Sequence, residues 1–411
     1  MGDSLRCLEM LARQASEGVI PTLNRIAMPI ISGPGTALPK SADVVIVGGG
    51  VVGCATAFFL AKAGLAPLVV ERDQLGCEAS GEAAGMLAPQ SEADIPGPFL
   101  ELGLAGRRLF SPLAEELKAA TGMEIEHRSI GILVPFFEDR DREVLHARAR
   151  WQQKSGLVAE TLDRREALAA EPLLSDKVEG AVSFPEEAHV NSRSLVMALA
   201  DAAGRHGATF ATGRPVIAVI RDGEKVAGVR CPGATVSTRT VVLAAGPWSS
   251  LFGEALGLLI PVSPAKGELL LVRPEGRLPH RIIYSKQAYL IPTPRGEAIL
   301  GTTTEFVGYD KRSTLAGLGA ILAGVSELIP TVGSATLLRA WAGLRPHTPD
   351  ELPLLGRHPR IEGLILATGH HRNGILLGPL TGRLVQELIL GMPPSIPLDP
   401  FRPDRTMRNA P

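Results

Sequence analysis

The sequence lacks the features of a membrane-spanning, exported or nucleic-acid-binding protein. No apolar run approaches the ~20 residues that a helix needs to cross a bilayer. The N-terminus has no basic stretch followed by an apolar segment and a small-residue cleavage site. The formal net charge is -1 and acids and bases are interleaved, so no positive field gathers phosphates or anionic lipid. We therefore expect a cytoplasmic protein with no transmembrane segment and no nucleic-acid partner.

Cysteine is scarce as well. The 4 cysteines show no CxxC or metal-finger spacing, and a chain of 411 residues needs no disulfide framework to fold. No cluster of metal ligands and no Ser/His/Asp order accompanies the motifs described below, so metal-dependent hydrolysis and acyl transfer lack their residues. We expect a reducing compartment and no metal.

What the sequence does contain is the start of a parallel sheet. Asp43–Val47 is a continuous apolar run that leads into glycines, which is typical of a strand buried on both faces. Residues 51–63 predict a helix closed by Gly64, and Pro67–Glu71 predicts the next strand. This βαβ order indicates an α/β protein with a Rossmann-like domain.

Later segments predict that this domain is interrupted. Residues 240–246 and 363–369 are apolar strands that would rejoin the sheet, whereas residues 261–304 alternate as antiparallel strands. Ser111 and Pro112 predict the start of one helix, and Asn191 predicts the cap of another. We expect a flexible N-terminal extension over 1–40, a discontinuous cofactor domain over 41–125, 185–260 and 335–397, a substrate domain over 126–184 and 261–334, and a C-terminal tail over 398–411.

The loop at 48–53 has the form GxGxxG. Gly48 permits a tight turn, Gly50 lets the backbone approach a pyrophosphate, and Gly53 lets the helix pack closely on the strand. The free N–H groups of the helix start would face the phosphate charge. Glu71 ends the second strand, where a carboxylate accepts hydrogen bonds from ribose hydroxyls. The loop predicts a dinucleotide, and it fits FAD and NAD equally.

Further motifs resemble the D-amino-acid oxidase superfamily, and within it the glycine oxidases of thiamine biosynthesis. The resemblance extends from Asp43 to about Met392, and its most specific parts are residues 71–73, 79–87, 241–248, 342–346 and 369–377. It implies non-covalently bound FAD, a homo-oligomer, and a Rossmann-like FAD-binding domain with an inserted antiparallel-sheet substrate domain.

The resemblance also implies which residues contact FAD. Most of them lie in the dinucleotide loop, in a small-residue segment after Glu71 and in the last strand-to-helix turn. Val216 would contact the adenine. A helix start near Gly374 would favour negative charge on reduced flavin. The residues are Gly48, Gly50, Val51, Val52, Gly53, Glu71, Arg72, Ala79, Ser80, Ala84, Gly85, Met86, Val216, Gly246, His371, Arg372, Asn373, Gly374, Ile375, Leu376 and Leu377.

For the substrate, the resemblance points to four residues. Arg345 falls where the family binds a carboxylate, and a guanidinium holds a carboxylate with two parallel hydrogen bonds. Arg372 would touch substrate or ring edge, and Tyr289 would close the pocket. Thr304 stands where a larger apolar residue lines the family's pocket, and His371 replaces an aromatic residue. Both departures leave the size of the substrate open.

We therefore expect oxidation of a small amino acid, first of all glycine to glyoxylate and ammonia, by hydride transfer from Cα to flavin N5 with O2 reduced to H2O2. The cofactor carries the chemistry, and the protein supplies orientation and electrostatics. Sarcosine, D-amino acids, imino acids, a glycine-to-cyanide reaction and a quinone acceptor remain alternatives. A flavin-binding module without catalysis is the alternative outside the enzymes.

Overall fold

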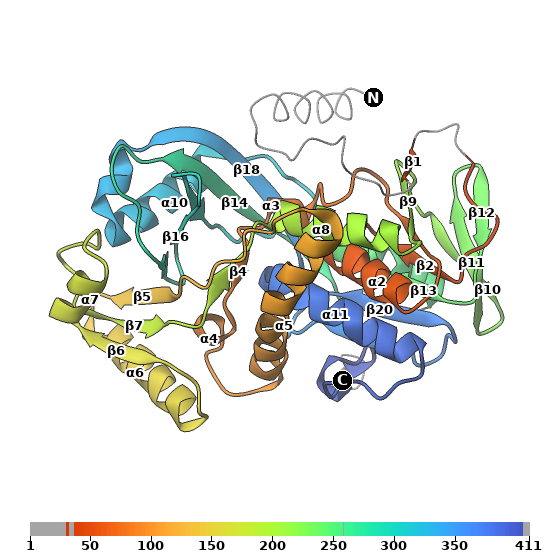
Figure 1. Cartoon of the computed structure of the whole chain (residues 1–411), viewed down its shortest axis with the longest axis horizontal. Helices are drawn as coiled ribbons and strands as arrows, with labels where there is room; N and C mark the ends of the chain where they lie inside the picture. Colours follow the sequence, from red (N-terminus) through yellow and green to blue (C-terminus); the bar gives the residue numbers. More distant parts are fainter. Residues whose placement is uncertain (1–29, 33–36, 258, 406–411) are drawn as a thin grey trace.

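The computed structural model describes residues 30–32, 37–257 and 259–405 of the 411-residue chain. Two large sheets lie toward opposite ends of the long axis (Figure 1), one seven-stranded and mostly parallel, the other eight-stranded and mostly antiparallel. This arrangement confirms the predicted α/β fold class. The predicted domain boundaries stay a prediction. None of the helices in the described ranges is long and apolar enough to cross a membrane.

The seven-stranded sheet has the order β1-β9-β3-β2-β13-β20-β19, and each neighbouring pair is parallel except β19 with β20. Four of its inner strands, β3, β2, β13 and β20, are buried along their whole length, which explains their largely apolar sequences. The strands are β1 (Ile30–Ser32), β9 (Thr209–Thr212), β3 (Pro67–Val70), β2 (Val44–Val47), β13 (Val241–Leu243), β20 (Leu364–Thr368) and β19 (Leu354–Arg357). All four strands predicted for this sheet are present.

Both ends of the described chain join the fold more closely than the sequence suggested. Ile30–Ser32, in the expected extension, pairs with β9, because an edge strand offers unpaired backbone groups to another segment. Leu38 packs against the apolar residues beside the sheet. In the expected tail, Phe401 is fully buried against the helices. Residues 1–29, 33–36 and 406–411 lie outside the described residues.

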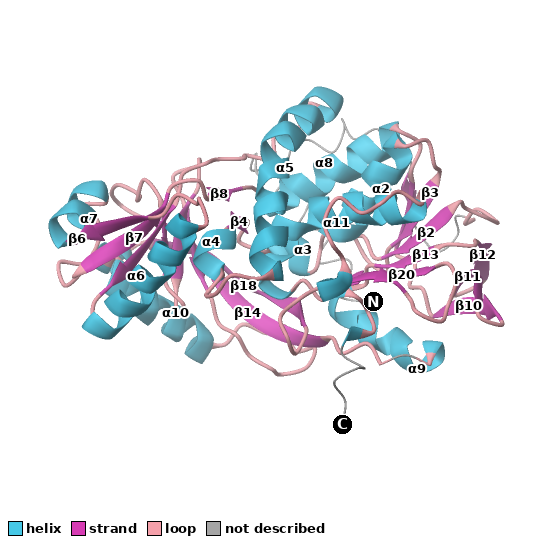
Figure 2. Cartoon of the chain, turned by 90° about the horizontal axis from the view of Figure 1, so that it is seen from below, coloured by secondary structure: helices cyan, strands magenta, loops and turns pink. Residues whose placement is uncertain are grey.

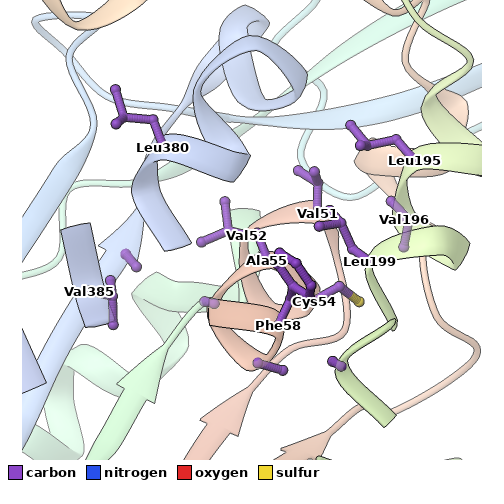
Figure 3. Packing of buried hydrophobic residues seen from close by; sticks show 14 of the residues in the cluster. Val51, Val52, Cys54, Ala55, Phe58, Leu195, Val196, Leu199, Leu380 and Val385 are labelled. Carbon is purple, nitrogen blue, oxygen red and sulfur yellow. The ribbon is translucent and has the colours of Figure 1, made fainter. Parts of the chain in front are cut away.

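Four helices cover one face of this sheet (Figure 2), and an antiparallel three-stranded sheet covers the other. Apolar side chains of three of the helices meet in one core (Figure 3). The helices are α2 (Val51–Lys62), α5 (Pro98–Thr121), α8 (Ser192–Arg205) and α11 (Gly374–Ile389), and the small sheet consists of β10 (Ala218–Asp222), β11 (Lys225–Cys231) and β12 (Ala234–Ser237).

Two predictions about helix starts had different outcomes. Asn191 caps α8 as predicted, because its side chain accepts a hydrogen bond of 3.0 Å from Ser194 N. The predicted start at Ser111 and Pro112 is wrong, since Pro112 lies inside α5, which begins at Pro98. Phe110 and the leucines that follow it are buried in the core, and this packing continues the helix through the proline.

The dinucleotide loop joins β2 to α2 at the carboxyl edge of the sheet. Gly48 has a φ of 110°, a conformation that glycine adopts without strain. A Cβ on Gly53 would lie 1.9 Å from the carbonyl oxygen of Gly48, so only glycine lets the helix approach this closely. The loop therefore has the close packing that its sequence predicts.

The eight-stranded sheet has the order β18-β14-β17-β16-β15-β5-β7-β6, and only β15 and β5 pair in parallel. This confirms the antiparallel strands predicted over residues 261–304. The strands are β18 (Thr336–His347), β14 (Ser263–Arg273), β17 (Ala298–Gly301), β16 (Tyr289–Pro292), β15 (Ile282–Tyr284), β5 (Ile132–Phe136), β7 (Gly180–Phe184) and β6 (Glu160–Asp163), and the helices near them are α6 (Asp139–Lys154), α7 (Arg164–Ala170) and α10 (Leu315–Leu328).

Short elements complete the fold, and some of them connect the two sheets. A two-stranded ladder joins the segment after α3 to the segment before α8, and a short helix, α4, follows it. The elements are α3 (Ala79–Glu82), β4 (Met86–Leu87), α4 (Pro89–Glu92), β8 (Ala188–His189), η2 (Gly246–Phe252), α9 (Gly253–Leu256), η3 (Pro330–Ser334), η4 (His371–Asn373) and η5 (Asp399–Phe401).

Deleting residues 1–40 should lower thermal stability without removing the cofactor. The deletion removes the β1 pairing and the Leu38 contacts, both at an edge of the fold. A loss of about 1–2 kcal/mol corresponds to a fall in Tm of roughly 1–2 °C in a chain of this size, because the entropy of unfolding grows with chain length. Calorimetry and flavin absorbance would measure both quantities. Loss of flavin would show that this segment contributes to the cofactor site.

Glu187 is fully buried and supports the short helix α4. Its Oε1 accepts hydrogen bonds from Gln90 N (2.5 Å) and Ser91 N (3.1 Å). Burial raises the pKa of Glu187 from 4.5 to about 7. Between these values the folded state holds a proton that the unfolded state has released, so stability falls as pH rises through this window.

Glu187→Gln keeps the acceptor and removes the titration. Its stability should therefore vary less between pH 5 and pH 8 than that of the wild type, by on the order of 3 kcal/mol. Urea unfolding at both pH values measures the difference. Glu186→Gln, at a half-exposed neighbour, is the matched control and should behave like the wild type. An unchanged pH dependence in Glu187→Gln would contradict the assignment.

Candidate functional site

A cavity of about 510 Å³ is lined by residues of both large sheets. At one end it meets the dinucleotide loop and the carboxyl edge of the parallel sheet, and at the other it meets β14, β16 and β18 of the antiparallel sheet. This volume lies within the range of small-molecule and cofactor sites. A single cavity therefore joins the predicted cofactor and substrate regions.

The structure brings most of the predicted cofactor residues together in the wall of this cavity. Gly53, Leu376 and Leu377 do not line it. Gly53 packs under the loop, and both leucines are buried in the core against α5. The predicted residues that line the cavity are Gly48, Gly50, Val51, Val52, Glu71, Arg72, Ala79, Ser80, Ala84, Gly85, Met86, Val216, Gly246, His371, Arg372, Asn373, Gly374 and Ile375.

The residues around the dinucleotide loop fit a nucleotide. The start of α2 faces the cavity, and Ser80 Oγ accepts a hydrogen bond of 2.9 Å from Val51 N. Glu71 accepts from Gly49 N at 2.6 Å and from Asp73 N at 2.9 Å, which orients its carboxylate at the end of β3. Burial is the largest effect on Glu71 and raises its pKa. Backbone donors and an oriented acid are the groups that a pyrophosphate and a ribose require.

An aromatic wall, which the sequence did not single out, closes the cavity beside Arg72. The guanidinium of Arg72 lies 3.5 Å from the ring centroid of Trp248, a cation–π contact. Trp248 stacks on Tyr309 with centroids 5.6 Å apart, and the Tyr309 hydroxyl donates to the carbonyl of Pro247 at 3.1 Å. The loop that follows β17 thus contacts the parallel-sheet part of the molecule.

Arg345 lies on β18, and its guanidinium lines the substrate end of the cavity. Nη1 donates to the carbonyl of Thr303 at 3.0 Å, and Nη2 donates to Thr302 Oγ1 at 2.6 Å. Among the described residues, no carboxylate forms an ion pair with Arg345. Burial lowers its pKa, yet a guanidinium stays charged at any physiological pH. The group has further N–H donors, so it can still bind an anion.

Arg372, by contrast, already has an acidic partner. Its Nε and Nη2 donate to the two carboxylate oxygens of Glu92 at 3.1 and 2.9 Å. Tyr284 completes the cluster, since its hydroxyl lies 3.1 Å from both Glu92 Oε1 and Arg372 Nη2. The Glu92 charge raises the pKa of Arg372. Arg372 therefore lines the cavity with its charge compensated.

Of the remaining predicted substrate residues, Tyr289 lines the cavity and Thr304 does not. Tyr289 is buried and stacks on Tyr284, with centroids 6.5 Å apart and planes 9° apart. Thr304 is exposed, and the hydroxyl that faces the cavity belongs to Thr302. The regular strand β17 ends at Gly301, so alternation along the strand could not predict which of the following side chains faces inward.

The two histidines before Arg372 have different surroundings. His370 is buried and shares a hydrogen bond of 2.9 Å with Thr381 Oγ1, which is a structural role. His371 lines the cavity, and its buried Nε2 has no hydrogen-bond partner among the described residues. Burial, followed by the charge of Arg345, lowers the pKa of His371 to about 3, so the ring is neutral near pH 7. An unpartnered nitrogen at this position fits a polar ligand in the cavity.

His371 also lies near His347 and Glu351, with one ligand atom of each within 4.8 Å of the others. Two imidazoles and a carboxylate are common metal ligands. However, the charges of both Arg345 and Arg372 act on His371. A further cation would be repelled there, and we assign no metal to this group.

Sequence patterns did not predict Glu92, Tyr284 or Thr302 as residues of the site. Glu92 and Arg372 are 280 residues apart and belong to no common motif. The hydroxyl of Tyr284 could have been noted only as one of three tyrosines. Such partners are recognised once the chain folds, because their contacts depend on the approach of distant segments.

Comparisons with known proteins agree with this geometry. A family model described as DAO, FAD dependent oxidoreductase, matches residues 43–388. The glycine oxidase of Geobacillus kaustophilus is 35% identical over 361 residues, which cover 87% of this chain and 96% of that protein. The bifunctional protein ThiO/ThiG of Synechocystis is 36% identical over 375 residues, which cover 90% of this chain and 54% of that protein.

The fold is similar to that of a solved relative as well. The crystal structure of glycine oxidase from Geobacillus kaustophilus superposes with a TM-score of 0.87 at 34% sequence identity, covering 89% of this chain and 99% of that one. The family match spans every segment that lines the cavity and all strands of both large sheets except β1. The chain therefore belongs to the DAO family of FAD-dependent oxidoreductases, and its cofactor is FAD.

Proposed function

We propose that this protein oxidises glycine to glyoxylate and ammonia, with O2 reduced to H2O2. The observation that carries the proposal is the guanidinium of Arg345, which has no acidic partner among the described residues and shares a cavity with the dinucleotide loop. A partly buried cation without an acidic partner favours an anionic ligand. The carboxylate of an amino acid supplies that anion, and the relatives named glycine oxidase support glycine.

The residues of the cavity would position this substrate. Arg345 holds the carboxylate with two parallel hydrogen bonds, which fixes the direction of Cα. Tyr289 closes the same end, and its hydroxyl stays protonated because burial raises its pKa. Bound FAD supplies the acceptor for the electrons that leave the carbon–nitrogen bond. The imine that glycine becomes is then hydrolysed by water to glyoxylate and ammonia.

Arg372 has a different place in this proposal. Because Glu92 compensates its charge, Arg372 contributes the shape of the wall and a hydrogen-bonding edge rather than the main anion anchor.

We further infer a role in thiamine biosynthesis in the cytoplasm, and a homo-oligomer stays a prediction. Assays with sarcosine, D-alanine and proline, and with a quinone in place of O2, separate the alternative substrates and acceptors.

The purified protein should be yellow and should release free FAD on acid treatment, because nothing in the cavity indicates a covalent link. With glycine and O2 it should form H2O2 and glyoxylate in equal amounts, measured by a peroxidase-coupled assay and by carbonyl derivatisation. A colourless protein, or a flavoprotein that reacts with other amines but leaves glycine unchanged, would contradict the proposal.

Arg345→Ala should lower kcat/KM for glycine by roughly thirtyfold to several-thousandfold, which corresponds to about 2–5 kcal/mol of lost transition-state binding. Arg345→Lys should recover only part of this, because an ammonium lacks the planar fork. Arg273→Ala, which removes an exposed ion pair with Glu297, is the control and should resemble the wild type. If Arg345→Ala with full flavin content kept wild-type kcat/KM, Arg345 would not be the anchor.

A further inference from the structure

A cluster of charged side chains lies behind the strand that faces Arg345. Lys266 and Glu268, both on β14, are 2% and 0% exposed, and Lys266 Nζ lies 2.8 Å from Glu268 Oε1. Lys266 Nζ also lies 3.1 Å from Glu305 Oε2. Lys266 and Glu268 do not line the cavity. Gly267, which lies between them, and Leu269, which follows them, do line it. The cluster therefore lies on the opposite face of β14 from the site, as the alternation of a strand requires.

Buried charges of this kind need an explanation other than stability. Removing ions from water costs several kcal/mol each, and a well-packed apolar replacement is often as stable. The backbone around the cluster suggests what the charges do. Glu268 also accepts hydrogen bonds of 3.1 Å from Thr314 N and Oγ1, at the first turn of α10. The cluster thus holds both the start and the end of the loop over residues 302–314.

The same loop holds the guanidinium of Arg345. Thr303 Oγ1 accepts from Glu268 N at 3.1 Å and donates to Glu305 Oε1 at 2.8 Å. Thr302 Oγ1 donates to the carbonyl of Glu268 at 3.0 Å. The carbonyl of Thr303 and the hydroxyl of Thr302 are the two acceptors for Arg345.

Gly267 makes room for this arrangement. A Cβ at Gly267 would lie 2.1 Å from Arg345 Nη2, so the guanidinium rests directly on the backbone of β14 between Lys266 and Glu268. Threonine hydroxyls and backbone atoms therefore form the connection from the charged cluster on one face of β14 to the cation on the other.

We propose that Thr303, together with the Lys266–Glu268–Glu305 cluster, positions the carboxylate anchor. The role rests on the proposed function, because it assumes that Arg345 binds the substrate carboxylate. Thr303 and this cluster, together called the relay, do not supply the positive charge. The relay fixes the Thr302–Thr303 segment, whose Thr302 hydroxyl and Thr303 carbonyl orient the guanidinium. Orientation is what a bidentate contact with a carboxylate requires.

The test compares two substitutions of Thr303 with the same substitution of its neighbour. Thr303→Val keeps the shape and removes the hydroxyl, whereas Thr303→Ser keeps the hydroxyl. Thr304→Val is the matched control, because Thr304 is exposed and lies outside the cavity. The readouts are FAD content, the dissociation constant of acetate from the change it causes in the flavin spectrum, and KM and kcat for glycine.

Thr303→Val should keep FAD and weaken acetate binding roughly tenfold, the effect of losing about one hydrogen bond of orientation. KM for glycine should rise by a similar factor, and kcat should fall less. Thr303→Ser should recover most of the acetate affinity, and Thr304→Val should match the wild type. A role limited to folding would change stability and FAD content and leave the acetate affinity of the folded holoenzyme unchanged.

Wild-type acetate binding in Thr303→Val would overturn the proposal, and so would an equal effect in Thr304→Val. If Thr303→Val does not fold, Glu305→Gln decides, since it removes the charge at the half-exposed end of the relay. Wild-type acetate affinity in Glu305→Gln would then overturn the proposal, and a clear loss with full FAD content would support it. A wild type that binds acetate but does not oxidise glycine would contradict the proposed function and leave the relay intact.

Discussion

The structure of the site depends on one partly buried cation, Arg345, that has no acidic partner in the described chain. Arg345 is held by two neutral oxygens, from Thr302 and Thr303, and not by a carboxylate. Such a group is costly while it stays unpaired and becomes favourable when an anion binds. A protein that supplied its own carboxylate here would gain stability and lose the binding site. Arg372, which lines the same cavity, has such a carboxylate partner in Glu92.

The arrangement of the two sheets places this cation in the same cavity as the dinucleotide loop. The parallel sheet ends at the glycine loop, where backbone N–H groups at the start of α2 face the cavity. The antiparallel sheet contributes long strands, β14 and β18, which carry Gly267 and Arg345 to the other end. Each sheet alone would present half a site. The cavity arises where the two sheets meet.

Local patterns predicted the parts of the molecule whose roles depend on neighbours in sequence. The GxGxxG loop, the buried strands and the Asn191 cap each need only a few consecutive residues, and each was predicted with its physical reason. Where several segments compete, the predictions were less accurate. Pro112 lies within α5 because core packing continues the helix, and Ile30–Ser32 pairs with β9 because an edge strand accepts it.

By itself, the sequence determined the α/β class, the dinucleotide loop and the presence of Arg345 after an apolar run, because backbone conformation and burial follow from short-range composition. Only the tertiary structure decided that Thr302 and not Thr304 lines the cavity, that Glu92 compensates Arg372 and leaves Arg345 without an acid, and that Lys266 and Glu268 lie on the opposite face of β14 from the cavity. Charge compensation depends on distances of a few ångströms between segments hundreds of residues apart, and only folding sets those distances.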